Sequence, residues 1–222
     1  MTDSDSANVA AETYSNLDLF EEDEYYSEIY DLALIGLNSF LCTEKDLQTF
    51  DCLEVSINEY FRTEAIEVSS KNISNTTIIW DNQRKRIVGF FTLNSGSYEI
   101  QNVIYKNKLK TKTRSQLKVF PVIYLSYFAI DKRYQRKRLG IHMMKEVFST
   151  LFSVSVFVGF VALIVESLHE STEFYEKLGF DYIKDKPGDC GIALHKYDMI
   201  IGFDELISTV ESEMIFPRSL FN

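Results

Sequence analysis

Cysteine is scarce in this sequence. The chain has three cysteines in 222 residues, Cys42, Cys52 and Cys190. Their number is odd and their spacing fits no metal-ligand pattern, so neither a disulfide framework nor a cysteine metal site is expected. We interpret them as reduced thiols of a cytoplasmic protein.

Long hydrophobic runs are also missing. The longest, Leu151–Val165, is interrupted by Ser153, Ser155 and Gly159 and is short for a membrane span. The sequence starts with acidic and polar residues, whereas a signal peptide starts with basic and then apolar residues. We therefore expect a cytoplasmic protein with no membrane segment.

Basic residues are absent before Lys45. Residues 1–44 hold eleven of the 33 acidic residues, which leaves 23 basic and 22 acidic residues in the remainder. The net charge of −10 is thus a property of the first 44 residues. We interpret 1–16 as an acidic, disordered tail and 17–44 as an acidic, partly helical N-terminal extension.

Positive charge is concentrated between residues 106 and 138. This stretch contains eleven Lys or Arg residues and a single acidic residue, Asp131. Such a stretch attracts a polyanion. For Lys106–Lys118 a solvated basic loop is an equally good interpretation, whereas for Arg133–Arg138, which precedes a helix, we favour a functional role.

The sequence as a whole has the composition of a globular protein, with 45% hydrophobic residues. Apolar periodicity predicts helices and β-branched or aromatic runs predict strands. The expected helices are 51–68, 140–158 and 171–178, and the expected strands are 76–80, 87–93, 98–105, 121–130, 161–165, 180–183 and 192–197. This order predicts one α/β (α+β) domain with a mixed sheet over residues 45–200, followed by a C-terminal extension, 201–222.

One stretch has the pattern of an anion site. A buried strand ends at Ile130, a basic turn covers Asp131–Arg138, and a helix starts near Gly140. The N–H groups of a first helical turn lack partners and carry partial positive charge, so they bind pyrophosphate well. The sequence has no Gly-x-x-x-x-Gly-Lys-Ser/Thr loop and no Gly-x-Gly-x-x-Gly turn, which argues against the common nucleotide-binding folds.

Two segments together carry a family resemblance. Residues 134–140, Tyr-Gln-Arg-Lys-Arg-Leu-Gly, resemble the acetyl-CoA motif Gln/Arg-x-x-Gly-x-Gly/Ala of the GNAT acetyltransferases, and 174–180, Phe-Tyr-Glu-Lys-Leu-Gly-Phe, resemble their later Phe-Tyr-x-x-x-Gly-Phe motif. The resemblance covers about residues 45–200. It implies the GNAT fold, a mixed, mostly antiparallel sheet flanked by helices, and an acetyl-CoA-dependent N-acetyltransferase acting on a primary amine.

Further segments are similar to one branch of that family, the toxin acetyltransferases of toxin–antitoxin pairs. They are Phe-Asp-Cys at 50–52, Ile-Asn-Glu-Tyr-Phe at 57–61, Val-Gly-Phe-Phe-Thr-Leu at 88–93 and Pro-Val-Ile-Tyr-Leu at 121–125. That branch acetylates the α-amine of aminoacyl-tRNA and blocks translation. The resemblance therefore implies charged tRNA as an acceptor, and it leaves open an antitoxin partner and a homodimer.

The resemblance also assigns residues. The strand residues Phe128, Ala129 and Ile130 would pair with the pantetheine of acetyl-CoA. Main-chain N–H groups of the turn would hold the pyrophosphate, at Gln135, Arg136, Lys137, Arg138, Leu139 and Gly140. Tyr175 would protonate the departing CoA thiolate, because a positioned phenol can act as a general acid. Glu166 and His169 are the local candidates for a base that deprotonates the amine.

The sequence departs from the pattern at three positions within the domain. Arg138 replaces the first motif glycine, Leu53 stands where the branch has glycine, and Tyr127 stands where toxin members often have arginine. Two alternatives therefore stay open at this point. One is acetylation of a small-molecule or protein amine, and the other is a degenerate, non-catalytic GNAT-fold binding module.

Overall fold

A computed structural model describes residues 31–37, 43–99, 119–184 and 195–213. The strands are β1 Leu32–Gly36, β2 Asn75–Asp81, β3 Arg86–Glu99, β4 Val119–Ile130, β5 Ala162–Leu168, β6 Asp181–Tyr182 and β7 Lys196–Gly202. The helices are α2 Glu44–Thr49, α3 Val55–Thr63, α4 Ala65–Ser70, α6 Leu139–Ser155, α7 Thr172–Lys177 and α8 Phe203–Glu213, with the short 3₁₀ helix η2 at His169–Ser171.

The strands form one sheet of seven strands in the order β1-β2-β3-β4-β5-β7-β6. Every neighbouring pair is antiparallel except β4 and β5, which are parallel. The parallel pair needs a crossover, and α6 supplies it. The predicted mixed, mostly antiparallel sheet in a single domain is confirmed.

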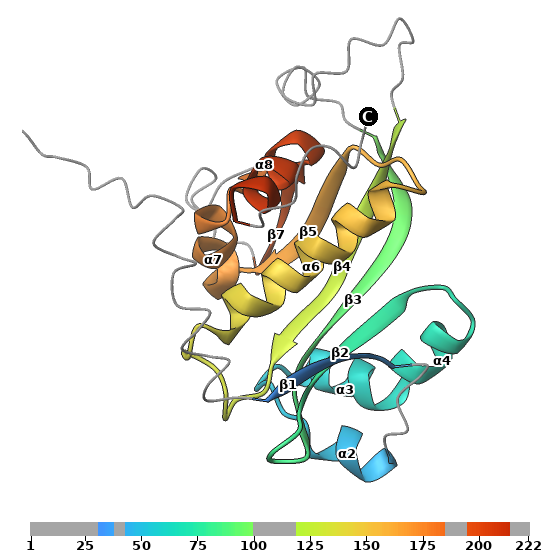
Figure 1. The fold of residues 1–222 in the computed structure, drawn as a ribbon, viewed down its shortest axis with the longest axis vertical. Helices are drawn as coiled ribbons and strands as arrows, with labels where there is room; N and C mark the ends of the chain where they lie inside the picture. The colour runs from blue at the N-terminus through green and yellow to red at the C-terminus, as the bar shows by residue number, and fades with distance from the viewer. Residues whose placement is uncertain (1–30, 38–42, 100–118, 185–194, 214–222) are drawn as a thin grey trace, which may run out of the picture.

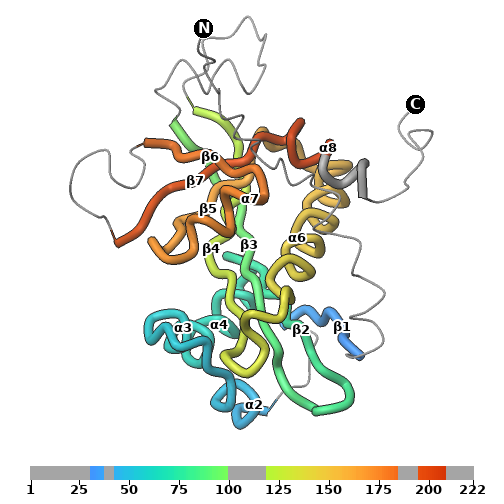
Figure 2. Tube along the Cα trace, turned by 90° about the vertical axis from the view of Figure 1, so that its left-hand side faces the viewer, coloured from blue at the N-terminus to red at the C-terminus, as the bar shows by residue number. Residues whose placement is uncertain are grey.

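Helices cover both faces of the sheet (Figures 1 and 2). On one face α6 places Met143, Met144 and Val147 in a core cluster that includes β4, β5 and β7 residues. On the other face, residues of α2–α4 pack against β2 and β3, centred on the fully buried rings of Phe61 and Phe90. These two rings stack with centroids 4.1 Å apart, and truncating either to alanine would cost about 3–5 kcal/mol of stability.

Several predicted elements are confirmed with shifted boundaries, and the prediction of one continuous helix over residues 51–68 is wrong. The predicted helix 51–68 is instead α3 and α4, and it starts only at Val55, because Leu53 has a positive φ of 75° that a helix cannot contain. The predicted third strand at 98–105 is, as far as Glu99, the end of the long strand β3; residues 100–105 lie outside the described residues.

The helical expectation for part of residues 17–44 is also corrected. Leu32–Gly36 is a strand, because its main chain can add to the free edge of β2 in antiparallel register. Residues 17–30 and 38–42 lie outside the described residues. None of the helices in the described ranges is both long enough and apolar enough to cross a membrane.

Strand β4 contains a bulge at the point where its pairing with β5 ends. Thr92 of β3 pairs with Tyr127 and Leu93 pairs with Leu125, so Ser126 is the extra residue of β4. Pairing between β4 and β5 stops at the same place, since the last pair is Leu125 with Val165. A bulge bends its strand, so the last residues of β4 separate from β5. In the described sheet, residues 126–130 therefore have a strand neighbour only on the β3 side.

Candidate active site

A cavity of about 490 Å³ lies where β4 and β5 separate, which is within the usual range for small-molecule sites. Four segments that are distant in sequence surround it: the end of β4, the turn leading into α6, the η2–α7 segment, and the loop before α3. Its lining residues are Cys52, Glu54, Ile57, Phe128, Ala129, Ile130, Gln135, Arg136, Arg138, Gly140, Ile141, Leu168, Glu170, Ser171, Phe174 and Tyr175.

Most of the residues that the sequence singled out come together here. The cavity is lined by Phe128, Ala129, Ile130, Gln135, Arg136, Arg138, Gly140 and Tyr175. Leu139 and Lys137 are not among the lining residues. Leu139 is 3% exposed and packs into the α6 core, whereas the Lys137 ammonium bonds to the Arg133 carbonyl 2.9 Å away and sits over the Tyr134 ring.

The turn between β4 and α6 has an unusual backbone. Arg136 and Arg138 have positive φ values of 57° and 56°, and Arg138 is the N-cap of α6. Residues other than glycine adopt this left-handed backbone conformation at a cost of about 1–2 kcal/mol each. Both residues nevertheless line the cavity, so the turn places two guanidinium-bearing residues beside the first turn of a 17-residue helix. That combination suits a pyrophosphate.

Two anchors hold this turn to other parts of the domain. The Tyr134 hydroxyl donates to Asp81 Oδ2 at 3.0 Å, and burial together with that hydrogen bond raises the pKa of Tyr134 to about 12. The Gln135 side chain donates from Nε2 to the carbonyl oxygens of Cys52 (3.1 Å) and Ile130 (2.9 Å). Gln135 thus lines the cavity and links the end of β4 to the loop before α3.

Tyr175 lies on α7 among aromatic rings. It is 5% exposed, and its ring centroid is 5.2 Å from that of Phe174 and 6.4 Å from that of Phe128. Burial raises the pKa of the Tyr175 phenol well above the ordinary value of 10.0. The hydroxyl makes no hydrogen bond with the part of the chain that the structure describes. It is therefore a protonated donor at physiological pH that has no competing acceptor among those residues.

The lining also includes residues that sequence reasoning did not assign to the site. Phe174 stands in the motif of Tyr175 but was not singled out, and Cys52, Glu54 and Ile57 come from a segment quoted only as a family pattern. Cys52 is 9% exposed, its thiol donates to Asn58 Oδ1 at 3.3 Å, and burial raises the pKa of the thiol. The presence of the Phe-Asp-Cys segment was the only sequence signal that could have placed it here.

Glu166 and His169 lie elsewhere. Neither is among the cavity-lining residues. The Glu166 side chain is 57% exposed and forms an ion pair with Lys196, with 2.6 Å between Oε1 and Nζ. His169 begins η2, and its ring lies near that of Tyr197. A base role for Glu166 stays a prediction from the sequence.

The ion pair leads to a definite expectation. We expect Glu166→Gln to lower turnover by less than about 10-fold, which is below the range typical of a general base. Steady-state assays at saturating acetyl-CoA measure this, with Lys196→Gln as the matched control that breaks the same ion pair and keeps the carboxylate. A loss of about 100-fold or more in Glu166→Gln alone would instead identify Glu166 as the base.

Comparison with known proteins identifies the family. Residues 43–201 match the family model described as an acetyltransferase (GNAT) domain. This chain belongs to the GNAT acetyltransferase family. The GNAT chain is therefore an N-acetyltransferase that uses acetyl-CoA.

Relatives of this GNAT chain include acetyltransferase toxins. It is 28% identical over 137 residues to a tRNA-acetylating toxin of Mycobacterium tuberculosis, a match that covers 61% of this chain and 78% of the relative. Its fold is similar to that of the toxin AtaT complexed with acetyl-methionyl-tRNAfMet, with a TM-score of 0.64 at 23% identity over 80% of this chain and 98% of the other. It is also similar to AtaTR bound with AcCoA, with a TM-score of 0.63 at 22% identity over 80% and 97% of the two chains.

Acetyl-CoA fits the residues around the cavity. The apolar rings of Phe128 and Phe174 and the side of β4 that lacks a strand neighbour suit a pantetheine arm, and Arg136, Arg138 and the start of α6 suit its pyrophosphate. A Cβ at Gly140 would lie 3.4 Å from Cε2 of the Phe174 ring, which is an ordinary van der Waals contact. A β-carbon at residue 140 would therefore pack against the Phe174 ring without a clash.

Proposed function

We propose that this enzyme transfers the acetyl group of acetyl-CoA to the α-amine of aminoacyl-tRNA, and so acts as a translation-blocking toxin. The observation that carries the proposal is the cavity beside the first turn of α6, which combines an arginine-lined turn with a buried tyrosine. The tRNA-acetylating activity of the Mycobacterium tuberculosis relative supports the acceptor class. A toxin of this kind would have an antitoxin partner.

Each group in the cavity has a proposed role. Acetyl-CoA supplies the activated acyl carbon when it is bound. Main-chain N–H groups of residues 135–140 and the side chains of Arg136 and Arg138 hold its pyrophosphate, and Phe128–Ile130 orient its pantetheine arm. Tyr175 donates a hydrogen bond, and then its proton, to the sulfur as the C–N bond forms and the C–S bond breaks. The proton that the amine loses in forming the amide restores the Tyr175 phenol.

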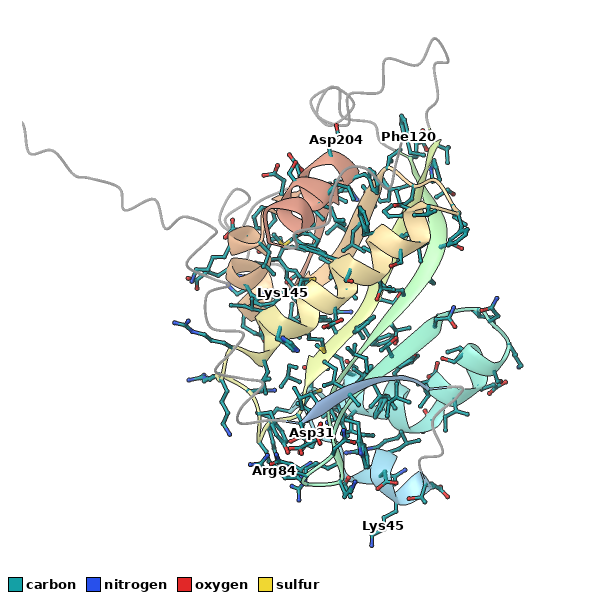
Figure 3. All side chains as sticks on the ribbon, in the orientation of Figure 1. Asp31, Lys45, Arg84, Phe120, Lys145 and Asp204 are labelled. Carbon is teal, nitrogen blue, oxygen red and sulfur yellow. The ribbon has the colours of Figure 1, made fainter. Side chains whose placement is uncertain are left out.

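A second acceptor class has its own support. The chain has a pI of about 4.9, and position 127 holds a tyrosine whose ring stacks on Tyr60 with centroids 3.6 Å apart, so no basic side chain occurs there. Glu99 and Val119, which flank the basic segment 106–118, pair at the opposite end of β4 from the cavity. In Figure 3, Phe120 marks this end of β4, and Arg84 marks the opposite end of the molecule. These features favour a small-molecule or protein amine.

Salt concentration separates the two acceptors. We expect the kcat/KM for charged tRNA to fall about 10-fold or more between about 50 and 200 mM NaCl, because even two phosphate contacts release counterions with that effect. Turnover of a small primary amine should change far less over the same range. Acetyl-CoA is kept saturating in both assays, so that its own phosphates do not contribute. A charged tRNA rate that is independent of salt, or absent, would reject the tRNA proposal.

A further inference from the structure

The turn that contacts the cavity poses a conformational problem. Arg136 and Arg138 both hold left-handed backbone conformations, which glycine adopts without steric cost and arginine does not. A backbone of this kind persists only when its surroundings over-determine it. The first residues of the turn supply such surroundings.

Asp131 is the first of these residues. Its carboxylate is completely buried, at 0% exposure. Oδ1 accepts from the Arg133 N–H (3.0 Å) and Nε (2.7 Å), and Oδ2 accepts from Arg133 Nη2 (2.7 Å) and from the Asp51 N–H (3.1 Å). The guanidinium of Arg133 also donates to the Thr49 carbonyl at 3.1 Å. One buried carboxylate thus fixes both the entry to the turn and the loop before α3.

Asp51, in the loop before α3, likewise accepts several hydrogen bonds and pairs with a basic residue of the turn. Its Oδ2 pairs with Lys132 Nζ at 2.8 Å, its Oδ1 accepts from Asn58 Nδ2 (2.8 Å) and from the Leu53 N–H (2.9 Å), and its carbonyl accepts from the Lys132 N–H at 2.8 Å. The hydrogen bond from Lys132 and those from Leu53 and Asn58 hold the pKa of Asp51 well below its usual range. The basic residues Lys132 and Arg133 are therefore engaged in holding the turn.

We propose that Asp131, assisted by Asp51, is a positioning residue for acetyl-CoA: the two carboxylates hold the turn in the shape that glycine would allow, so that Arg136 and Arg138 face the pyrophosphate. The inference rests on the proposed cofactor site. It assigns to a carboxylate network the conformational role that the motif glycine, replaced here by Arg138, has in the family pattern. The sequence alone gave Asp131 no role.

The sign of the charge effect makes the proposal testable. Acetyl-CoA is a polyanion, so removing a negative charge beside its site should tighten binding if Asp131 acts only through its charge. A positioning role predicts the opposite. We expect Asp131→Asn to weaken acetyl-CoA binding about 10-fold or more, since hydrogen bonds to a charged group are lost, and to change kcat at saturation little.

Calorimetric titration with acetyl-CoA measures the affinity, and circular dichroism and thermal unfolding show that the variants are folded. Glu67→Gln is the charge-matched control, because Glu67 is an exposed acid on α4 that pairs with Lys71. Its affinity should equal that of the wild type. Asp51→Asn is the second variant in case Asp131→Asn does not fold, since the Asp51 side chain is 33% exposed, and it should weaken binding in the same direction.

A double-mutant cycle tests the conformational link itself. Arg138→Ala and Arg138→Gly both remove the guanidinium, but only glycine relieves the left-handed backbone at residue 138. Asp131→Asn should therefore cost at least about 5-fold less affinity in the Arg138→Gly background than in the Arg138→Ala background.

Equal losses in the two backgrounds, or tighter binding in Asp131→Asn, would overturn the positioning role. A wild-type protein that binds no acetyl-CoA would overturn this inference together with the cofactor site. Normal acetyl-CoA binding with no acetylation of charged tRNA would reject the acceptor alone, and the affinity cycle would then still decide the inference.

Discussion

Replacing Tyr175 by phenylalanine should lower turnover about 100- to 10,000-fold while leaving the affinity for acetyl-CoA nearly unchanged. The range is that of a lost general acid, and the ring that packs against Phe128 and Phe174 is retained. Because the hydroxyl has no hydrogen-bond partner among the described residues, its removal should not destabilise the fold. Single-turnover kinetics and calorimetry with acetyl-CoA separate the chemical step from binding.

The matched control for this change is Tyr197→Phe. Tyr197 is also buried, at 3% exposure, but it lies in the core outside the cavity lining. Its turnover per folded molecule should equal that of the wild type. Tyr175→Phe turnover within about 3-fold of the wild type would rule out the general-acid role.

The pH profile of the wild type gives an independent test of the same residue. Tyr175 donates only in its neutral form, and burial raises its pKa above the ordinary 10.0, so the donor is lost only at higher pH than for an exposed tyrosine. The rate at which the enzyme acetylates an α-amine should rise as the amine loses its proton near pH ~8 and then stay level up to about pH 10. A decline between pH ~8 and ~10 in a stably folded protein would contradict a buried, neutral Tyr175.

The second large effect is expected for Gly140→Glu, which should abolish acetyl-CoA binding, with a loss of affinity above about 100-fold. Like charges brought together at an interface cost several kcal/mol, and the new carboxylate would face the phosphates. Its Cβ would lie 3.4 Å from the Phe174 ring, an ordinary van der Waals contact, so the charge is the expected cause of the loss. Stability should not fall, because glutamate is a better helix former than glycine and is favourable in the first turn of α6.

Two controls isolate the cause. Gly159→Glu adds the same group beyond the other end of α6, where a Cβ would meet no atom within 4 Å, and should leave the affinity unchanged. Gly140→Ala adds only the Cβ and should weaken binding slightly. Retained acetyl-CoA binding in a folded Gly140→Glu protein would show that the pyrophosphate binds somewhere else.

Much of the fold was predictable because it depends on local patterns. The hairpin of β2 and β3, the buried strand β4 and the helices α6 and α7 follow from periodicity and from turn residues such as Gly179, which has a positive φ of 89°. One miss had a non-local cause, and the other came from a local turn that apolar periodicity does not show. The β1 segment became a strand because β2 offered an edge, and Leu53 delayed the start of α3 because a hydrogen bond from its N–H to Asp51 accompanies its left-handed backbone.

By itself, the sequence determined the family motifs, the strand–turn–helix around Ile130 and Gly140, and the tyrosine that follows one strand later, because each depends on residues close together in the chain. Only the tertiary structure decided which basic residues line the cavity and which hold the turn. Arg136 and Arg138 line it, whereas Arg133 and Lys132 pair with Asp131 and Asp51. The physical reason is that Asp51 and Lys132 are 81 positions apart, and no local pattern shows that folding will bring their charges within 2.8 Å.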